Sequence, residues 1–195
     1  DVNSVAVLEA IDIEFLERVA ALGRRYGKKR IQAPMLMTPK YIERSLDVFP
    51  LEFLEFTTSH IVVWGRDFFE GLGFEKSDVR AACERDLKSL LMKARRGYLT
   101  SLNDARRLKS LIIELTNAAL PIIRGLVYLV DAEAPPAKAD LVAACGRHLA
   151  ISAGPFESAL SMRSANAKPS FEHLQDVFSD IYNQTEAAAD EADRA

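Results

Sequence analysis

The sequence has few of the residues that mark several common protein classes. It contains two cysteines, nine glycines, eight prolines and one tryptophan in 195 residues. This composition excludes a disulfide framework, a collagen-like repeat and a glycine- or proline-rich disordered chain. Cys83 and Cys145 fall within helical patterns and have no paired spacing. They are expected to be small buried apolar residues of a reduced, cytoplasmic protein.

Long apolar runs and an excess of one charge are also missing. The longest nearly apolar run, residues 118–130, is interrupted by Pro121, Arg124 and Gly125, and it falls short of the roughly 20 residues that a membrane span needs. The formal net charge is −3, from 25 Lys and Arg against 28 Asp and Glu. We therefore expect no membrane partner, and the charge balance argues against nucleic acid as a partner.

The first third of the sequence alternates between strand-like and helix-like patterns. Valine-rich residues 2–8 predict a buried strand, and apolar residues at spacings of three and four predict a helix over residues 12–27. A second strand is expected over residues 33–37, followed by a helix that Thr38 caps. A third strand is expected over residues 51–56, with Glu52 on one of its faces. These elements predict a small α/β unit.

Helical periodicity dominates the rest of the chain. We expect a kink at Pro121 and a frayed acidic end after Gln184. The predicted fold class is mostly α, α+β: a small incomplete sheet with helices over residues 1–75, then an antiparallel helical bundle over residues 76–195. Helices are expected at residues 77–98, from about residue 101 through the kink at Pro121 to the break at residues 132–136, at 137–150 and 156–162, and from residue 170 onward.

Familiar catalytic signatures are absent from the sequence. It has no phosphate-binding glycine loop, no nucleophile elbow and no dinucleotide fingerprint. The three histidines, His60, His148 and His173, lie far apart without the spacing of metal ligands. They are expected to be ordinary surface or helix residues.

Acidic and amide side chains mark the ends of two predicted strands. Asp1 and Asn3 share a face because strand side chains alternate. An adjacent strand could add Glu52 or Glu55 to the same pocket. Carboxylate oxygens suit Mg²⁺, which would also hold substrate phosphates. The alternative is a set of solvated polar residues at strand ends.

The segment from residue 76 to residue 109 is basic, with ten Lys and Arg against four Asp and Glu. Arg80, Arg85 or Arg95 could meet the phosphates of a nucleotide or of an RNA backbone. The alternative is a solvated helix face with ion pairs, for which Glu84 and Lys88 have the right spacing.

Seven aromatic residues lie near the expected junction of the two parts. We expect them to pack in a core rather than to stack on bases. The run over residues 61–64 is ambiguous between strand and helix. The aromatic residues are Phe49, Phe53, Phe56, Trp64, Phe68, Phe69 and Phe74.

Four motifs together resemble a bacterial nucleotidyltransferase family. They are SLDVFPLEF at residues 45–53, VWGRD at 63–67, RAACERDL at 80–87 and LMKARRGYL at 91–99. In that family a polymerase-β-like nucleotidyltransferase domain precedes an all-helical domain. The similarity covers about residues 1–100, and the remainder is similar only in its helical character. The resemblance implies that the sheet of the α/β unit is nucleotidyltransferase-like, with an Asp-x-Asp pair and a later acid that hold two metal ions.

The resemblance implies a role for each matching residue. Asp1 stands at the first acid of the pair, Asn3 at the second and Glu52 at the third acid. Asp1 and Glu52 would hold Mg²⁺, and Arg80 or Arg85 would steady phosphates. Asn3 is neutral, so metal affinity should fall. The family's Gly-Ser turn is not in the sequence, which begins at Asp1, so we expect an N-terminally incomplete or degenerate relative.

The expected function is transfer of a nucleoside monophosphate from a nucleoside triphosphate to a hydroxyl group of a small molecule, protein or RNA. The alternative is a non-catalytic scaffold whose helical bundle binds a protein partner or a second copy of itself. A third alternative is RNA binding through residues 76–109, which would weaken steeply with salt.

Overall fold

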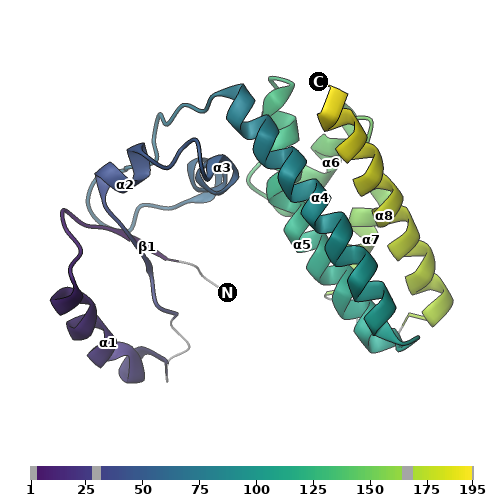
Figure 1. Ribbon diagram of the computed structural model, residues 1–195, viewed down its shortest axis with the longest axis horizontal. Helices are drawn as coiled ribbons and strands as arrows, with labels where there is room; N and C mark the ends of the chain where they lie inside the picture. Colours follow the sequence, from purple (N-terminus) through teal and green to yellow (C-terminus); the bar gives the residue numbers. More distant parts are fainter. Residues whose placement is uncertain (1–3, 28–31, 164–168, 195) are drawn as a thin grey trace. The chain divides into compact units, whose positions relative to one another are not determined.

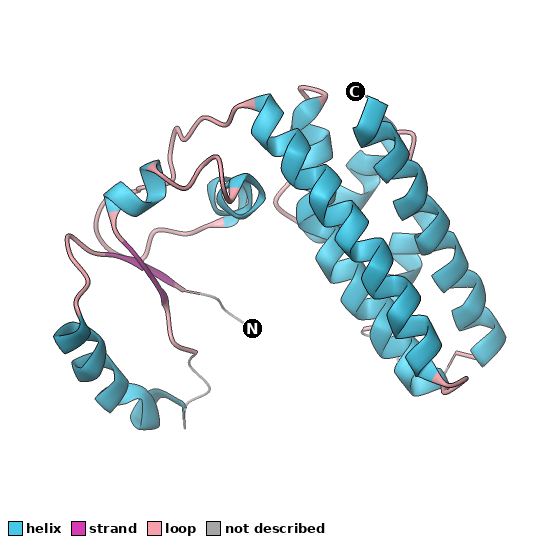
Figure 2. Ribbon diagram, viewed as in Figure 1, coloured by secondary structure: helices cyan, strands magenta, loops and turns pink. Residues whose placement is uncertain are grey.

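The computed structural model describes residues 4–27, 32–163 and 169–194. Over these residues the protein is mostly helical with one small parallel sheet, so the predicted fold class is confirmed (Figures 1 and 2). The chain forms two compact units. The α/β unit comprises Asp1–Leu46 and Val62–Glu70, and the helical unit comprises Asp47–Ile61 and Gly71–Ala195. The sequence analysis divided the chain once, after residue 75. In the structure, residues 47–61 cluster with the helical unit instead of the α/β unit.

The α/β unit is built from β1 (Val5–Val7), α1 (Ile13–Gly27), β2 (Met35–Met37) and α2 (Pro39–Glu43). The two strands pair in parallel, with Val5 opposite Met35 and Val7 opposite Met37. Parallel pairing needs a crossover, which α1 provides. Both strands and α1 lie within the ranges that the sequence predicted.

Local capping fixes the start of both helices in the α/β unit. The Asp12 carboxylate accepts a hydrogen bond from the Phe15 amide at 2.7 Å. The predicted Thr38 cap is confirmed, because its hydroxyl oxygen accepts from the Tyr41 amide at 3.1 Å. These side chains satisfy amide groups that a helix start leaves without an intrahelical partner.

The helical unit consists of α3 (Pro50–Ser59), α4 (Lys76–Ser101), α5 (Ala105–Leu129), α6 (Lys138–His148), α7 (Gly154–Ser161) and α8 (Phe171–Arg194). A short turn makes α4 and α5 an antiparallel hairpin, and α8 packs against both (Figure 1). Leu102 and Asn103 in this turn adopt left-handed conformations. The Asp104 carboxylate then accepts from the amides of Arg106 and Arg107. The turn thus reverses the chain, and the Asp104 cap starts α5.

The core of the helical unit is centred on α5. Leu108, Ile112 and Val127 are fully buried there, together with apolar residues from α4, α6 and α8. Gly125 allows a close approach, because a Cβ at this position would lie 2.5 Å from Leu51 Cδ2 and 2.7 Å from Cys83 Sγ. Helix α5 continues through Pro121 as one element.

The whole of α5 is long and apolar enough to cross a membrane. The sequence analysis considered only the apolar run at residues 118–130, which is too short to do so. However, 61% of its apolar window is buried inside the protein. The central helix of a water-exposed bundle has the same properties. We therefore interpret α5 as the core helix of this unit.

The expected frayed end after Gln184 is wrong. Helix α8 continues to Arg194, and Ala188, Ala189 and Ala192 are buried along it. Alanine has the highest helix propensity, and its small side chain permits close packing. The absence of large apolar residues therefore concealed a packed helical face.

Candidate functional site

Asp1 and Asn3 lie outside the described residues. Strand β1 begins two residues after Asn3, at Val5. The placement of this pair on one face of the first strand therefore stays a prediction.

Glu52 does not lie on a strand, and this correction removes the geometric basis of the predicted acidic pocket. Residues 51–56 belong to α3, in which Pro50 occupies the first turn. Leu51, Phe53 and Leu54 are buried, whereas Glu52 is exposed. Proline is favoured at this helix position, and an acid is favoured in the first turn by the helix dipole. The alternation of Leu51 and Phe53 suggested a strand, but Leu54 completes a helical face.

Glu55, one turn further along α3, is held by an arginine. Arg124 Nε donates to Glu55 Oε2 at 2.7 Å, and Arg124 Nη1 donates to the Pro135 carbonyl oxygen at 2.8 Å. The Arg124 side chain is only 1% exposed. Burying a guanidinium is costly unless it is paired and hydrogen bonded, so these contacts fasten α3 and the 132–136 loop to α5.

The importance of Arg124 was missed in the sequence, although a signal was there. It is the only charged residue in the nearly apolar run over residues 118–130. An isolated charge in a buried helix requires a partner. That partner could not be identified from the sequence, because Glu55 is 69 positions away.

The described residues do not form the expected Mg²⁺ site by themselves. Among residues 4–27, 32–163 and 169–194, no three His, Cys, Asp or Glu side chains are grouped so that they could hold a metal ion. Of the expected ligands only Glu52 is described, and a single exposed carboxylate does not select Mg²⁺. We therefore derive no reaction step through a metal.

Arg80 and Arg85 both lie on α4, but they do not form a common phosphate-binding face. They are five residues apart, which places them roughly 140° apart around a helix. Arg80 is half-buried. Arg85 is exposed, and its Nε donates to Asp86 Oδ1 at 2.9 Å. The structure thus separates the two arginines that were expected to steady phosphates.

Several basic residues of the 76–109 segment are paired with acids. The predicted pair of Glu84 and Lys88 is confirmed, with Nζ and Oε1 2.6 Å apart. Lys93 likewise lies 2.8 Å from Glu114, and Arg95 contacts both Tyr182 and Glu186 on α8. These contacts support the ion-paired interpretation of this surface.

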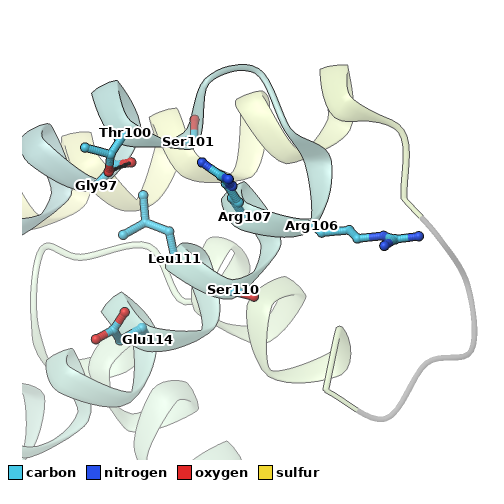
Figure 3. A pocket seen from close by; sticks show the side chains of 8 residues that line it. All are labelled: Gly97, Thr100, Ser101, Arg106, Arg107, Ser110, Leu111 and Glu114. Atoms are coloured by element: carbon cyan, nitrogen blue, oxygen red, sulfur yellow. Dashed lines mark hydrogen bonds between the residues drawn. The ribbon is translucent and has the colours of Figure 1, made fainter.

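A surface pocket of about 420 Å³ lies beside the α4–α5 turn. Figure 3 shows Arg107 near Ser101, whereas Arg106 points away from the other labelled side chains. The pocket contains none of the predicted site residues. It is lined by Gly97, Thr100, Ser101, Arg106, Arg107, Ser110, Leu111 and Glu114.

Both cysteines are buried, as predicted. Burial, with a smaller contribution from Asp86, raises the pKa of the Cys83 thiol to about 12. Burial raises the pKa of Cys145 to about 11. Because the thiolate is the reactive form, neither residue is suited to act as a nucleophile.

No protein-family model, curated protein or solved structure matches this chain. The resemblance to nucleotidyltransferases therefore depends on the four sequence motifs.

Proposed function

We propose that this chain is a nucleotidyltransferase-like protein that transfers a nucleoside monophosphate to a hydroxyl acceptor. In this reaction the acceptor oxygen bonds to the α-phosphorus, the bond from that phosphorus to the bridging oxygen breaks, and pyrophosphate leaves. The hydroxyl proton passes to a base or to water. Acceptors of this chemistry include small molecules, proteins and RNA.

The observation that carries the proposal is the parallel β1–α1–β2 unit directly after Asp1 and Asn3. The resemblance implies an Asp-x-Asp pair on a strand of such a sheet, and Asp1 and Asn3 stand at these two positions of the sequence. The four motifs over residues 45–99 add support from the sequence. The two buried cysteines are consistent with a reduced, cytoplasmic setting, which is part of the proposal.

In this proposal Asp1 holds Mg²⁺ and Asn3 contributes a neutral oxygen, whereas Glu52, which lies on α3 of the helical unit, has no role at the metal. When bound, Mg²⁺ would offset the negative charge of the triphosphate.

Isothermal titration of the 195-residue chain with ATP and Mg²⁺ tests the proposal. We expect binding that is lost in Asp1→Ala. Glu43→Ala is the matched control, because it removes an exposed carboxylate from α2 and should leave binding unchanged. Absence of heat with the parent chain contradicts the proposal.

A second candidate function is a non-catalytic scaffold that binds a protein. It is favoured by the corrected position of residues 51–56, which lie on a helix packed in the helical unit rather than on a strand. This candidate predicts that a chain with its full helical circular dichroism gives no heat with ATP and Mg²⁺. Nucleotide binding that depends on Asp1 contradicts it.

A further inference from the structure

The pocket beside the α4–α5 turn belongs to the helical unit alone, because that unit supplies all of its lining residues (Figure 3). Its volume of about 420 Å³ is within the range of small-molecule sites. Ser110, Leu111 and Glu114 follow Arg107 by three, four and seven residues on α5. Residues at this spacing share one face of a helix, so α5 presents a continuous wall to the pocket.

The inner side of the pocket is apolar. Leu111 lines it and is buried, with 8% of its surface exposed. Gly97 faces this leucine from α4, and a Cβ at Gly97 would collide with Leu111 Cδ1. The glycine therefore lets the two helices approach closely at the base of the pocket. Such a base can cover the carbon skeleton of a ligand.

One end of the pocket is positively charged. Arg107 is exposed in the first turn of α5, and its side chain lies near Ser101 of α4 (Figure 3). Asp104 Oδ1 already accepts from the amides of Arg106 and Arg107, so a ligand at this end would meet the guanidinium group instead of the helix amides. The charges of the two arginines exceed the single negative charge of Asp104. Arginine recognises oxyanions through its paired N–H donors.

The acid at the other end of the α5 wall is already paired. Glu114 Oε1 lies 2.8 Å from Lys93 Nζ, which approaches from α4. The lysine offsets the negative charge of the carboxylate, so Glu114 repels an anion less than an unpaired acid would. The pocket as a whole therefore favours a negatively charged ligand.

Hydroxyl groups supply further polar lining. Ser110 is exposed on α5, and its hydroxyl can donate to a ligand oxygen. Thr100 Oγ1 donates to the carbonyl oxygens of Arg96 and Gly97, at 3.0 and 3.1 Å. Its proton is thus engaged, whereas its lone pairs can accept from a ligand hydroxyl.

We propose that this pocket binds a phosphate monoester of a small hydroxyl-bearing molecule. Arg107 and Ser110 hold the phosphate, which carries close to two negative charges at neutral pH and three acceptor oxygens. Thr100 accepts from a hydroxyl of the ligand, and Leu111 contacts its carbon atoms. The site does not depend on the proposed nucleotidyl transfer, because Asp1 belongs to the α/β unit.

Amide NMR of the 195-residue chain, titrated with glycerol phosphate in the absence of ATP and Mg²⁺, tests the proposal. We expect saturable shifts that are largest at residues 97–114. Inorganic phosphate should bind more weakly, because it has no hydroxyl-bearing skeleton to contact Thr100 and Leu111. Glycerol at the same concentrations should cause no shifts, because it has no charge for Arg107 to recognise.

Arg107→Gln should weaken binding of glycerol phosphate at least about tenfold, because it removes the charged donor. The matched control is Arg147→Gln, which changes an exposed arginine on α6 and should leave binding unchanged. Glu114→Gln should tighten binding, because it removes a negative charge from the pocket and leaves Lys93 without its acid. All three positions are at the surface, and unchanged circular dichroism would show that the variants fold.

Four results would overturn the proposal. They are the absence of shifts with glycerol phosphate, shifts of equal size with glycerol, equal losses in Arg107→Gln and Arg147→Gln, and weaker binding by Glu114→Gln. Equal losses in the two arginine variants would mean that phosphate is attracted by the basic surface in general. None of these measurements uses ATP or Mg²⁺, so this site can fail while the proposed activity stands.

Discussion

The two units of this chain differ in how completely they bury their apolar side chains. In the described part of the α/β unit, the buried apolar residues are Met37, Ile42 and Phe69. The helical unit has a continuous core that joins side chains from α3 to α8. A helix satisfies its backbone hydrogen bonds locally, whereas a strand depends on partners elsewhere in the sequence. The helical unit is therefore built from local patterns, whereas the small sheet depends on the pairing of β1 with β2 across α1.

The largest expected effect is on the core of the helical unit. Leu108 is fully buried on α5, so Leu108→Ala should lower the free energy of unfolding by about 4 kcal/mol. Leu99→Ala, at a position 77% exposed, is the control and should have little effect. Urea unfolding followed by far-UV circular dichroism measures both.

Ile42→Ala makes the corresponding truncation in the α/β unit, where Ile42 is 2% exposed. If the two units differ as described, this change should leave the main helical transition nearly unaltered. A loss in that transition equal to the loss in Leu108→Ala would contradict the comparison.

The next effect concerns the contact between α3 and α5. Glu55→Ala leaves the Arg124 guanidinium buried without its carboxylate partner, and should cost about 2 kcal/mol. Glu52→Ala removes the same group from an exposed position on the same helix, and should cost less than about 0.5 kcal/mol. Equal losses in thermal unfolding would mean that the Glu55–Arg124 pair does not fasten α3.

Residues 51–56 show why the helices were easier to predict than the candidate site. Leu51 and Phe53 fit the alternation of a strand, and only the buried Leu54 reveals a helical face. In a segment this short both periods fit, so tertiary packing decides. The long stripe of α4 had no such ambiguity, because residues three and four apart repeat over many turns.

The predicted site depended on residues that are distant in sequence. Local patterns identified β1, α1 and β2, but the pocket needed Glu52 on a third strand. Likewise, the contact of Glu55 with Arg124 crosses 69 positions and has no local signature. At Trp64, aromatic character predicted a packed core, whereas the side chain is 94% exposed.

Two helical glycines should respond to alanine in opposite directions. Gly125→Ala would place a Cβ against Leu51 and Cys83 in the core, and should destabilise the chain by about 1–2 kcal/mol. Gly23 lies on α1 in open space, because a Cβ added there would meet no atom within 4 Å. Gly23→Ala should stabilise α1 by about 0.5–1 kcal/mol, because alanine has higher helix propensity.

Thermal unfolding measures both glycine variants, and hydrogen exchange can assign the Gly23 effect to α1. A stabilising effect of Gly125→Ala would show that the core has space at this position. The contrast between the well-packed helical unit and the open α/β unit would then fail.

The smallest expected effect is pH dependence at the start of α5. Hydrogen bonds from the amides of Arg107 and then Arg106 lower the pKa of Asp104 below its ordinary value. A carboxyl group whose pKa is lower in the folded than in the unfolded chain stabilises the folded state at pH values above its unfolded-state pKa. This stabilisation is lost as the pH falls through the folded-state pKa. Asp104→Asn keeps a capping oxygen but cannot ionise. The melting temperatures of the parent and Asp104→Asn chains should therefore converge on acidification. The difference between the parent and an Asp47→Asn control, changed at an exposed position, should show no such convergence. A constant difference between the parent and Asp104→Asn would mean that Asp104 does not cap α5 as a carboxylate.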